Sequence, residues 1–305
     1  MSRIPDTKKL ILINIPSTHD STAYYINRIF KNLAQTQYFN IKQQLEIGTR
    51  KIDIRVTVRN KKKEEDEDII CCHGICDCYA SNKCGNMKKL TLKSILFDIK
   101  NFLIQNPSET VMISVVLGRG KKTGNETLKR AYEVFHKYVG DMSINYYHDL
   151  ILGDARGKII NLTYFHQEID ETIVNTEVNY SNYNLNYGTG IEEVHKKYKS
   201  YRPFKVNGHL KIHEIKDMFI KYKMTLEEAE IEEKINTKLF PISYSISCTG
   251  EKDFCFPSPF TQANIVHSFI QKDGVFKKGY YYGWIKMDFA NYLSNYKLID
   301  TNLSK

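Results

Sequence analysis

Hydrophobic and polar positions along the chain follow two alternating periods. Residues 51–59 (KIDIRVTVR) alternate with a period of two and place Ile, Ile, Val and Val on one face, which predicts a half-buried strand. Residues 90–105 instead repeat apolar positions at helical spacing and stop before Asn106 and Pro107. Residues 110–117 (TVMISVVL) are apolar almost throughout, as in a strand buried on both faces. Strand-like and helix-like segments therefore follow one another.

The same alternation extends over the rest of the chain. Further segments with strand character are residues 9–16, 69–74, 157–164, 240–248 and 279–289, and further segments with helical character are 127–139, 212–235 and 262–271. Strands separated by helices favour a parallel sheet. About seven or eight such strands in one chain favour a barrel over an open sheet. We therefore predict an α/β fold, a single TIM-type (β/α) barrel that can be irregular or incomplete, over residues 1–305 as one domain.

Two segments depart from this pattern. Residues 60–68 (NKKKEEDED) are charged throughout and are predicted to be a solvated loop between two strands. Residues 170–205 are rich in Asn and Tyr and are predicted to be an extended loop over one face of the barrel.

Composition limits the partners of the chain. The 305 residues include 42% hydrophobic side chains, enough for a sizeable core, and 44 Lys and Arg against 35 Asp and Glu give a net charge of +9. A basic surface attracts nucleic acid, acidic lipid or phosphorylated small molecules, but no nucleic-acid-binding motif is found. The apolar run at 10–15 is too short for a signal peptide or a membrane span. We expect a cytoplasmic protein with peripheral membrane association.

Five of the seven cysteines lie close together, at positions 71, 72, 76, 78 and 84. A zinc site would need a second matched Cys-x-x-Cys pair, which this segment lacks. Surface disulfides would need an oxidising compartment. Because no signal peptide is predicted, free thiols are favoured over disulfides.

Candidate chemistry lies at the ends of the predicted strands, where a parallel barrel forms its active site. Six polar residues occupy such positions, namely His19, Asp20, Asp53, Arg55, His73 and Asp288. Asp53 and Arg55 share one face of their strand because residues two apart point the same way. Each residue alone has a structural explanation, such as a buried histidine, a strand ion pair or a helix cap. Their common placement is what favours a site.

This set of side chains suits the cleavage of a phosphodiester. One imidazole takes a proton from an attacking hydroxyl and the other gives a proton to the leaving oxygen, because a histidine populates both protonation states near neutral pH. Carboxylates orient the imidazoles, and a guanidinium stabilises negative charge on the phosphoryl oxygens. No metal ion or other cofactor is required.

Several motifs in order along the chain resemble one family. They are IPSTHDSTAY at 15–24, QLEIGTRKIDIRV at 44–56, CCHG at 71–74, LTLKSILFDIKNFLIQNPSETVMISV at 90–115, LGDARGKIINL at 152–162 and GWIKMDF at 283–289. Together they resemble the X domain of phosphatidylinositol-specific phospholipases C, in particular the compact bacterial type. The resemblance implies a TIM-type barrel that cleaves phosphatidylinositol, or a glycosylated form, to diacylglycerol and inositol 1,2-cyclic phosphate.

The resemblance also implies roles for the six polar residues. His19 corresponds to the general base and His73 to the general acid. Asp288 corresponds to the carboxylate paired with the base, and Asp20 to the one that supports the acid. Arg55 corresponds to the phosphate-stabilising arginine, and Asp53 is expected to orient it.

Two positions in the sequence indicate whether the reaction needs a metal ion. Calcium-dependent relatives have Asn after the first histidine and a carboxylate at the position of Arg55, whereas this chain has Asp20 and a guanidinium that would repel a cation. The resemblance therefore implies a metal-independent enzyme.

The positions that contact the inositol ring differ from the family pattern. Val116, Tyr164 and Lys196 lie nearest to the expected inositol contacts, and Tyr198 matches an aromatic residue under the sugar ring. Tyr164, Lys196 and Tyr198 are thus the candidate substrate-binding residues. The alternatives left open are the same barrel and chemistry on another phosphodiester headgroup, or a catalytically inactive scaffold that binds membranes.

The predicted lipid substrate implies a transient contact with a membrane surface and no obligate protein partner. The segment after the first strand contains Tyr24, Tyr25, Ile26, Ile29 and Phe30, with Arg28 and Lys31 between them. It fits either a rim that rests on anionic lipid or a helix that packs its apolar stripe on the barrel.

Overall fold

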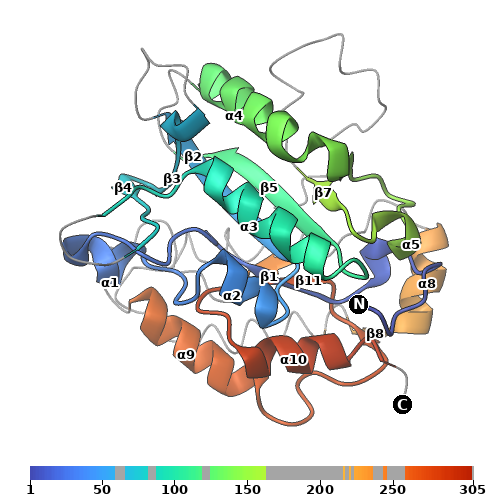
Figure 1. Cartoon of the computed structure of the whole chain (residues 1–305). Coiled ribbons are helices and arrows are strands. Elements are labelled where there is room, and N and C mark those ends of the chain that lie inside the picture. Colours follow the sequence, from blue (N-terminus) through green and yellow to red (C-terminus); the bar gives the residue numbers. More distant parts are fainter. Residues whose placement is uncertain are drawn as a thin grey trace.

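A central parallel sheet organises the molecule (Figure 1). The computed structural model describes residues 1–58, 66–81, 87–118, 124–162, 216, 220, 223–235, 243–245 and 258–303. The parallel strands are β1 (Ile15–Thr18), β2 (Lys51–Val58), β5 (Val111–Leu117), β6 (Ser143–Asn145), β7 (Ile159–Asn161), β9 (Ser243–Ser245) and β11 (Trp284–Met287). They are ordered β6-β7-β5-β2-β1-β11-β9. This confirms the predicted α/β class.

Helices lie around these strands (Figure 1). The α-helices are α1 (Lys31–Ala34), α2 (Ile41–Glu46), α3 (Leu92–Gln105), α4 (Gly124–Val139), α5 (Leu152–Ala155), α8 (Leu226–Ile235), α9 (Pro259–Ile270) and α10 (Tyr292–Asp300). Short 3-10 turns are η1 (Leu10–Leu12), η2 (Arg28–Phe30), η3 (Asp66–Asp68) and η5 (Gly140–Met142). No helix in the described part of the chain has the length and apolarity that crossing a membrane requires.

The outward faces of the strands make the hydrophobic core. Ile52, Ile54 and Val56 of β2 pack in one cluster with the apolar stripe of α3, as their two-residue period predicts. Ile285 and Met287 of β11 pack against α9 and α10 in another cluster. Because side chains alternate along a strand, the polar residues between these positions point to the inside of the sheet.

The inward faces change from apolar to polar toward the carboxyl ends of the strands. Ile15 lies beside Trp284, and the next inward pair is Ser17 beside Lys286. Ser17 also lies beside Lys51 of β2. His19 follows one step later, at the end of β1. The polar site is therefore built on an apolar base inside the sheet.

The third predicted strand is not part of the parallel sheet. β3 (Ile69–His73) pairs antiparallel with β2, with Val56 opposite Cys71, and forms a hairpin with β4 (Cys76–Asp77). The prediction that His73 ends a parallel strand is wrong. His73 reaches the site because β3 runs back along β2 toward the level of Arg55.

Three other predicted elements differ in detail. Residues 9–16 begin with the 3-10 turn η1, and their strand starts only at Ile15. The predicted strand 279–289 is divided into β10 (Tyr280–Tyr281) and β11 by Gly283, whose φ of 71° favours glycine. The predicted helix 212–235 is interrupted by β8 (Met224–Thr225), which pairs with β10.

One buried side chain, Asn14, fixes the position of β1 next to β11. Its amide nitrogen donates to the carbonyl oxygen of Tyr280 (2.8 Å) and to Oγ1 of Thr301 (2.7 Å). Its amide oxygen accepts from the backbone nitrogens of Tyr282 (2.6 Å) and Gly283 (2.9 Å). All the hydrogen-bonding capacity of the amide is thus used just before the two strands that carry His19 and Asp288.

We expect Asn14→Ala to lower the free energy of unfolding by about 2–4 kcal/mol, because buried backbone groups lose their partners. Urea denaturation measures this change. Lys42→Ala serves as a control, since its exposed pair with Glu46 spans 4.0 Å, and it should change stability by less than about 0.5 kcal/mol. Equal effects of both substitutions would contradict the proposed importance of Asn14.

Candidate active site

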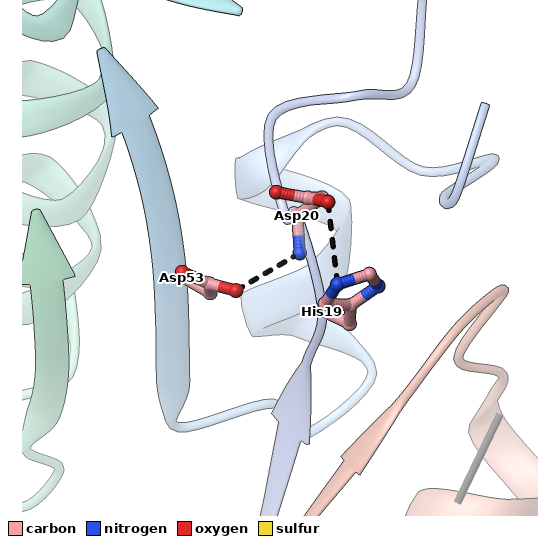
Figure 2. Close-up of side chains that lie close together, drawn as sticks. All are labelled: His19, Asp20 and Asp53. Atoms are coloured by element: carbon pink, nitrogen blue, oxygen red, sulfur yellow. Dashed lines mark hydrogen bonds and ion pairs between the residues drawn. The ribbon is translucent and has the colours of Figure 1, made fainter. Parts of the chain in front are cut away.

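The first strand delivers His19 and Asp20 through a strained turn. The backbone nitrogen of His19 donates to the carbonyl oxygen of Met287 (3.1 Å) and so extends the pairing of β1 with β11. Asp20 then has a φ of 42°, in the left-handed region that few residues other than glycine adopt. Asp53 Oδ2 accepts from the backbone nitrogen of Asp20 (3.2 Å) (Figure 2). The turn points the Asp20 carboxylate into the site.

The last strand delivers Asp288 in the same way. His19 Nδ1 lies 2.8 Å from Asp288 Oδ1. Phe289, the next residue, has a φ of 47°, unusual for a bulky side chain. Its backbone nitrogen donates to the carbonyl oxygen of Thr36 (2.6 Å), and its ring packs against Phe260 and Tyr38. Strained backbone next to both His19 and Asp288 is typical of a functional site.

The carboxylate of Asp20 is the centre of the site. Its Oδ2 lies 3.0 Å from His73 Nε2 and 3.2 Å from His19 Nε2, and Figure 2 shows the contact with His19. Arg55 forms an ion pair with Oδ1 through Nε and lies 3.1 Å from His19 Nε2 through Nη2. The two imidazole rings are 6.3 Å apart between centroids. Two histidines and one guanidinium therefore surround one buried carboxylate.

The carboxylates lie behind the groups that face solvent. The side chains of Asp20 and Asp288 are 1% exposed, whereas those of His19, His73 and Arg55 are 17%, 23% and 31% exposed. This layering leaves the imidazoles and the guanidinium accessible. It keeps the carboxylates of Asp20 and Asp288 away from water.

Asp53 completes the polar cluster from below. Burial alone would raise the pKa of its carboxyl, but the charges of Lys286, Arg55 and His19 outweigh burial and hold that pKa well below its ordinary value. Lys286 Nζ lies 3.5 Å from Asp53 Oδ2. The carboxylate of Asp53 therefore stays ionised.

Oxygen and nitrogen atoms of His19, Asp20 and Asp53 approach one another within 4.8 Å, close enough for a shared cation. In this structure Arg55 forms an ion pair with Asp20, and Lys286 lies beside Asp53. A guanidinium and an ammonium thus supply the positive charge at both carboxylates. A divalent ion at this point would have to displace these two cationic side chains.

The structure brings together all six residues that the sequence places at strand ends. The three candidate substrate-binding residues, Tyr164, Lys196 and Tyr198, lie outside the described residues. So does the predicted loop 170–205. Val116 lies beside Arg55 in the pairing of β5 with β2, which is the position where a polar contact to the headgroup was sought.

Supporting residues that the sequence did not reveal hold the site in place. Gln37 Nε2 donates to the carbonyl oxygens of His19 and Met287, both at 3.0 Å. His267 Nε2 donates to the carbonyl oxygen of Asp288 (2.8 Å), and its Nδ1 lies 2.8 Å from Ser294 Oγ. Nothing in the sequence around Gln37 or His267 signals these contacts, because both partners are distant along the chain.

The cysteine cluster does not take part in this chemistry. Cys71, Cys72, Cys76 and Cys78 are buried thiols outside any disulfide, as the sequence predicts, and Cys84 lies outside the described residues. Burial raises the pKa of the Cys71 and Cys78 thiols. Cys71 and Cys72 lie in β3, the strand that also carries His73, and Cys76 lies in β4.

Comparison with known proteins identifies the region that contains most of this site. Residues 13–161 match the model of the phosphatidylinositol-specific phospholipase C X domain. The match to the X domain includes His19, Asp20, Asp53, Arg55 and His73, and Asp288 lies outside it. The resemblance predicted from the sequence motifs is confirmed.

Two curated bacterial proteins are similar in sequence to part of this chain. The 1-phosphatidylinositol phosphodiesterase of Listeria monocytogenes serovar 1/2a is 35% identical over 116 residues, which cover 37% of this chain and 31% of the relative. The enzyme of that name from Staphylococcus aureus strain Newman is 29% identical over 139 residues, covering 45% of this chain and 39% of the relative. The sequence match thus spans about a third of these relatives.

Solved structures are similar over nearly the whole chain. A phosphatidylinositol-specific phospholipase C variant from Staphylococcus aureus superimposes with a TM-score of 0.68 at 19% identity, covering 99% of this chain and 96% of that one. The enzyme from Listeria monocytogenes gives a TM-score of 0.60 at 21% identity, covering 100% and 98%. The fold is therefore an irregular (β/α) barrel, as predicted.

The buried position of His267 makes the stability of the folded protein sensitive to acid. Burial lowers the pKa of His267, so the folded protein keeps the imidazole neutral while the unfolded chain binds a proton at about pH 6.5. The contribution of His267 to the free energy of unfolding is therefore fully present above pH 6.5. It falls as the pH drops toward the pKa of the folded state, by up to about 1.4 kcal/mol per pH unit.

We expect His267→Gln to unfold with a shallower pH dependence between pH 6.5 and 5. Denaturation at several pH values measures the slope. His136→Gln, at an exposed position of α4, provides the control and should keep the wild-type slope. An unchanged slope in His267→Gln would mean that another group determines the acid sensitivity.

Proposed function

We propose that this chain cleaves phosphatidylinositol, or a glycosylated form of it, to diacylglycerol and inositol 1,2-cyclic phosphate. The observation that carries the proposal is the different environment of the two imidazoles on either side of Asp20. The X-domain match and the names of the relatives support the substrate class. The whole chain is proposed to act as one barrel domain, since solved enzymes of this class superimpose on 99% of it.

Hydrogen-bond partners distinguish the two histidines. His73 Nδ1 donates to the carbonyl oxygen of Ala34 (2.7 Å), and its Nε2 faces the Asp20 carboxylate. Both partners only accept, so the imidazolium, with two N–H donors, suits this position. His19 Nδ1 faces the Asp288 carboxylate, while Nε2 lies against a donor of Arg55. His19 Nε2 also lies 3.2 Å from Asp20 Oδ2, and a neutral ring with a lone pair on Nε2 suits its contact with Arg55.

These states match the two proton transfers of the reaction. The inositol 2-hydroxyl attacks phosphorus while its proton passes to His19 Nε2, and a new P–O bond forms. The bond from phosphorus to the diacylglycerol oxygen breaks, and that oxygen takes the proton of His73 Nε2. Asp288 stabilises the imidazolium that forms at His19. Arg55 would leave Nε2 to bind the phosphoryl oxygens, which frees the base.

The same geometry supports a metal-independent reaction. Arg55 supplies the positive charge beside Asp20 that a cation would supply, and Lys286 supplies it beside Asp53. Neither role requires an ion from solution.

A second candidate substrate follows from the inward face of β5. Val116, next to Arg55, offers no polar contact to a headgroup hydroxyl. The same chemistry on another phosphodiester with a neighbouring hydroxyl is therefore the alternative function. An inactive scaffold is disfavoured, because all six site residues are present in one cluster.

A membrane-facing rim lies next to His73. Tyr24 and Ile26 are buried in the core, whereas Ile29 in η2 is 81% exposed and Ile75 at the tip of the β3–β4 hairpin is 80% exposed. Figure 1 places α1 and this hairpin on the same side of the molecule, and Ala34 at the end of α1 contacts His73. We expect these exposed apolar side chains, with Arg28 and Lys31, to rest on anionic lipid. The association is peripheral, and the free thiols fit a reducing compartment such as the cytoplasm.

Incubation of the pure protein with phosphatidylinositol vesicles and excess chelator should yield inositol 1,2-cyclic phosphate. His19→Ala and His73→Ala should each reduce turnover by about 10²–10⁴-fold, the usual contribution of a general base or acid. Chromatography of the water-soluble products measures the yield. Turnover only after addition of calcium would contradict the metal-independent reaction, and vesicle binding without turnover of any lipid would favour a scaffold.

Ile29→Asp and Ile75→Asp should each weaken vesicle binding by about tenfold or more, since each loses the burial of an apolar side chain in lipid. Sedimentation with anionic vesicles measures the binding. Ile104→Asp is a matched control, because Ile104 is 64% exposed at the end of α3, at the opposite end of the barrel from the site. Similar binding losses for all three variants would argue against a localised rim.

A further inference from the structure

A layer that contains two lysines lies directly beneath the site. Ser17 of β1 has Lys51 of β2 as its neighbour on one side and Lys286 of β11 on the other. Both lysines are buried inside the sheet, with residue exposures of 1% and 7%. Lys51 Nζ lies over the ring of Trp284, 5.3 Å from its centroid, whereas Lys286 Nζ extends to Asp53 Oδ2. Buried ammonium groups are costly and need a reason.

Lys286 is connected to the histidines and Arg55 through two residues, Asp53 and then Asp20. Asp53 Oδ2, the same oxygen that Lys286 approaches, accepts from the backbone nitrogen of Asp20. Asp20 has the strained backbone conformation that directs its carboxylate to His19, His73 and Arg55. An ammonium under Asp53 thus acts on the geometry around the histidines without touching them.

The charge balance of the site is a further reason for a buried ammonium group at Lys286. Three buried carboxylates, those of Asp20, Asp53 and Asp288, face the guanidinium of Arg55, the ammonium of Lys286 and one imidazolium. Burial and repulsion from Lys286 lower the pKa of Lys51 to about 7, so Lys51 is not a constant positive charge at neutral pH. Lys286 is needed for the sum to be zero with one histidine protonated, which is the state that acid–base catalysis requires.

After Lys286, the next positive charge that acts on Asp53 is that of Arg55, two residues along the same strand. Without Lys286, the guanidinium would be drawn from Asp20 and His19 toward Asp53. The phosphate-binding group and the base would then lose their alignment.

We propose that Lys286 is a positioning residue, whose ammonium neutralises Asp53 and thereby keeps Arg55 on Asp20 and His19. This role rests on the proposed function for its effect on catalysis, but its effect on the histidines is independent of the substrate. Lys286 does not touch the reacting atoms. Its contribution should appear in the turnover step and in the titration of His19.

The test compares Lys286→Met, Lys286→Arg, Asp53→Asn and the double variant Lys286→Met/Asp53→Asn with the wild-type protein. Ile285→Val is the matched control, because Ile285 lies next to Lys286 in β11 but packs on the outward side. Hydrolysis of soluble inositol 1,2-cyclic phosphate measures turnover without a membrane. NMR titration of the histidine rings measures protonation without any turnover.

Lys286→Met should lower kcat by about tenfold or more with KM changed less than about twofold, and Lys286→Arg should restore most of the loss. The double variant should be no slower than Asp53→Asn alone, because the lysine acts through Asp53. The pKa of His19 should rise by about half a unit or more in Lys286→Met, because a nearby positive charge is lost. The groups that face His19, namely Asp20, Asp288, Arg55, His73 and Asp53, remain in this variant.

Lys286→Met with wild-type kcat and an unchanged His19 titration, or a kcat loss that Ile285→Val reproduces, would overturn the proposal. If the wild-type protein turns over none of these substrates, the proposed function fails, and the His19 titration still decides the role of Lys286. If Lys286→Met does not fold, the comparison of Asp53→Asn with the double variant decides it, because the buried charges are then removed as a pair. An additive loss in the double variant would contradict action through Asp53.

Discussion

The arrangement of the site depends on the burial of three carboxylates beside two imidazoles. A buried charge must be compensated by an opposite charge or by hydrogen bonds. Asp20 achieves this with both histidines and Arg55, Asp288 with His19, and Asp53 with Lys286 and a backbone N–H. Because each side chain is held by an ion pair or a hydrogen bond from another, the side chains have little freedom to move. Such a preorganised cluster suits the stabilisation of charge during a reaction.

The backbone next to this cluster is strained at two places. The two strands that supply the His19–Asp288 pair are each followed by a residue with positive φ, Asp20 after β1 and Phe289 after β11. The strain is held by long-range contacts, from Asp53 to Asp20 and from Thr36 to Phe289. Gln37 joins the two strand ends by bonding the carbonyl oxygens of His19 and Met287. Thr36 and Gln37 therefore support the site from outside the cluster of histidines and carboxylates.

The connection between the site and its surroundings is most direct at His73. One ring nitrogen is bound to Ala34, which ends the exposed segment η2–α1, and the other lies at Asp20. The same imidazole thus contacts the rim proposed to meet lipid and the carboxylate at the centre of the site. A surface contact at this rim is one hydrogen bond away from the proposed general acid.

The sequence alone determined the fold class and most of the site. Two-residue and helical periods located β2, β5 and α3, because burial of one face constrains every second or every third to fourth position. Polar residues at strand ends identified His19, Asp20, Asp53, Arg55, His73 and Asp288. Tertiary structure alone decided that β3 runs antiparallel, that Asp20 lies between both histidines, and that Gln37, His267 and Lys286 support them. These contacts join residues far apart in the chain, and no local pattern of hydrophobicity records which distant polar groups will meet.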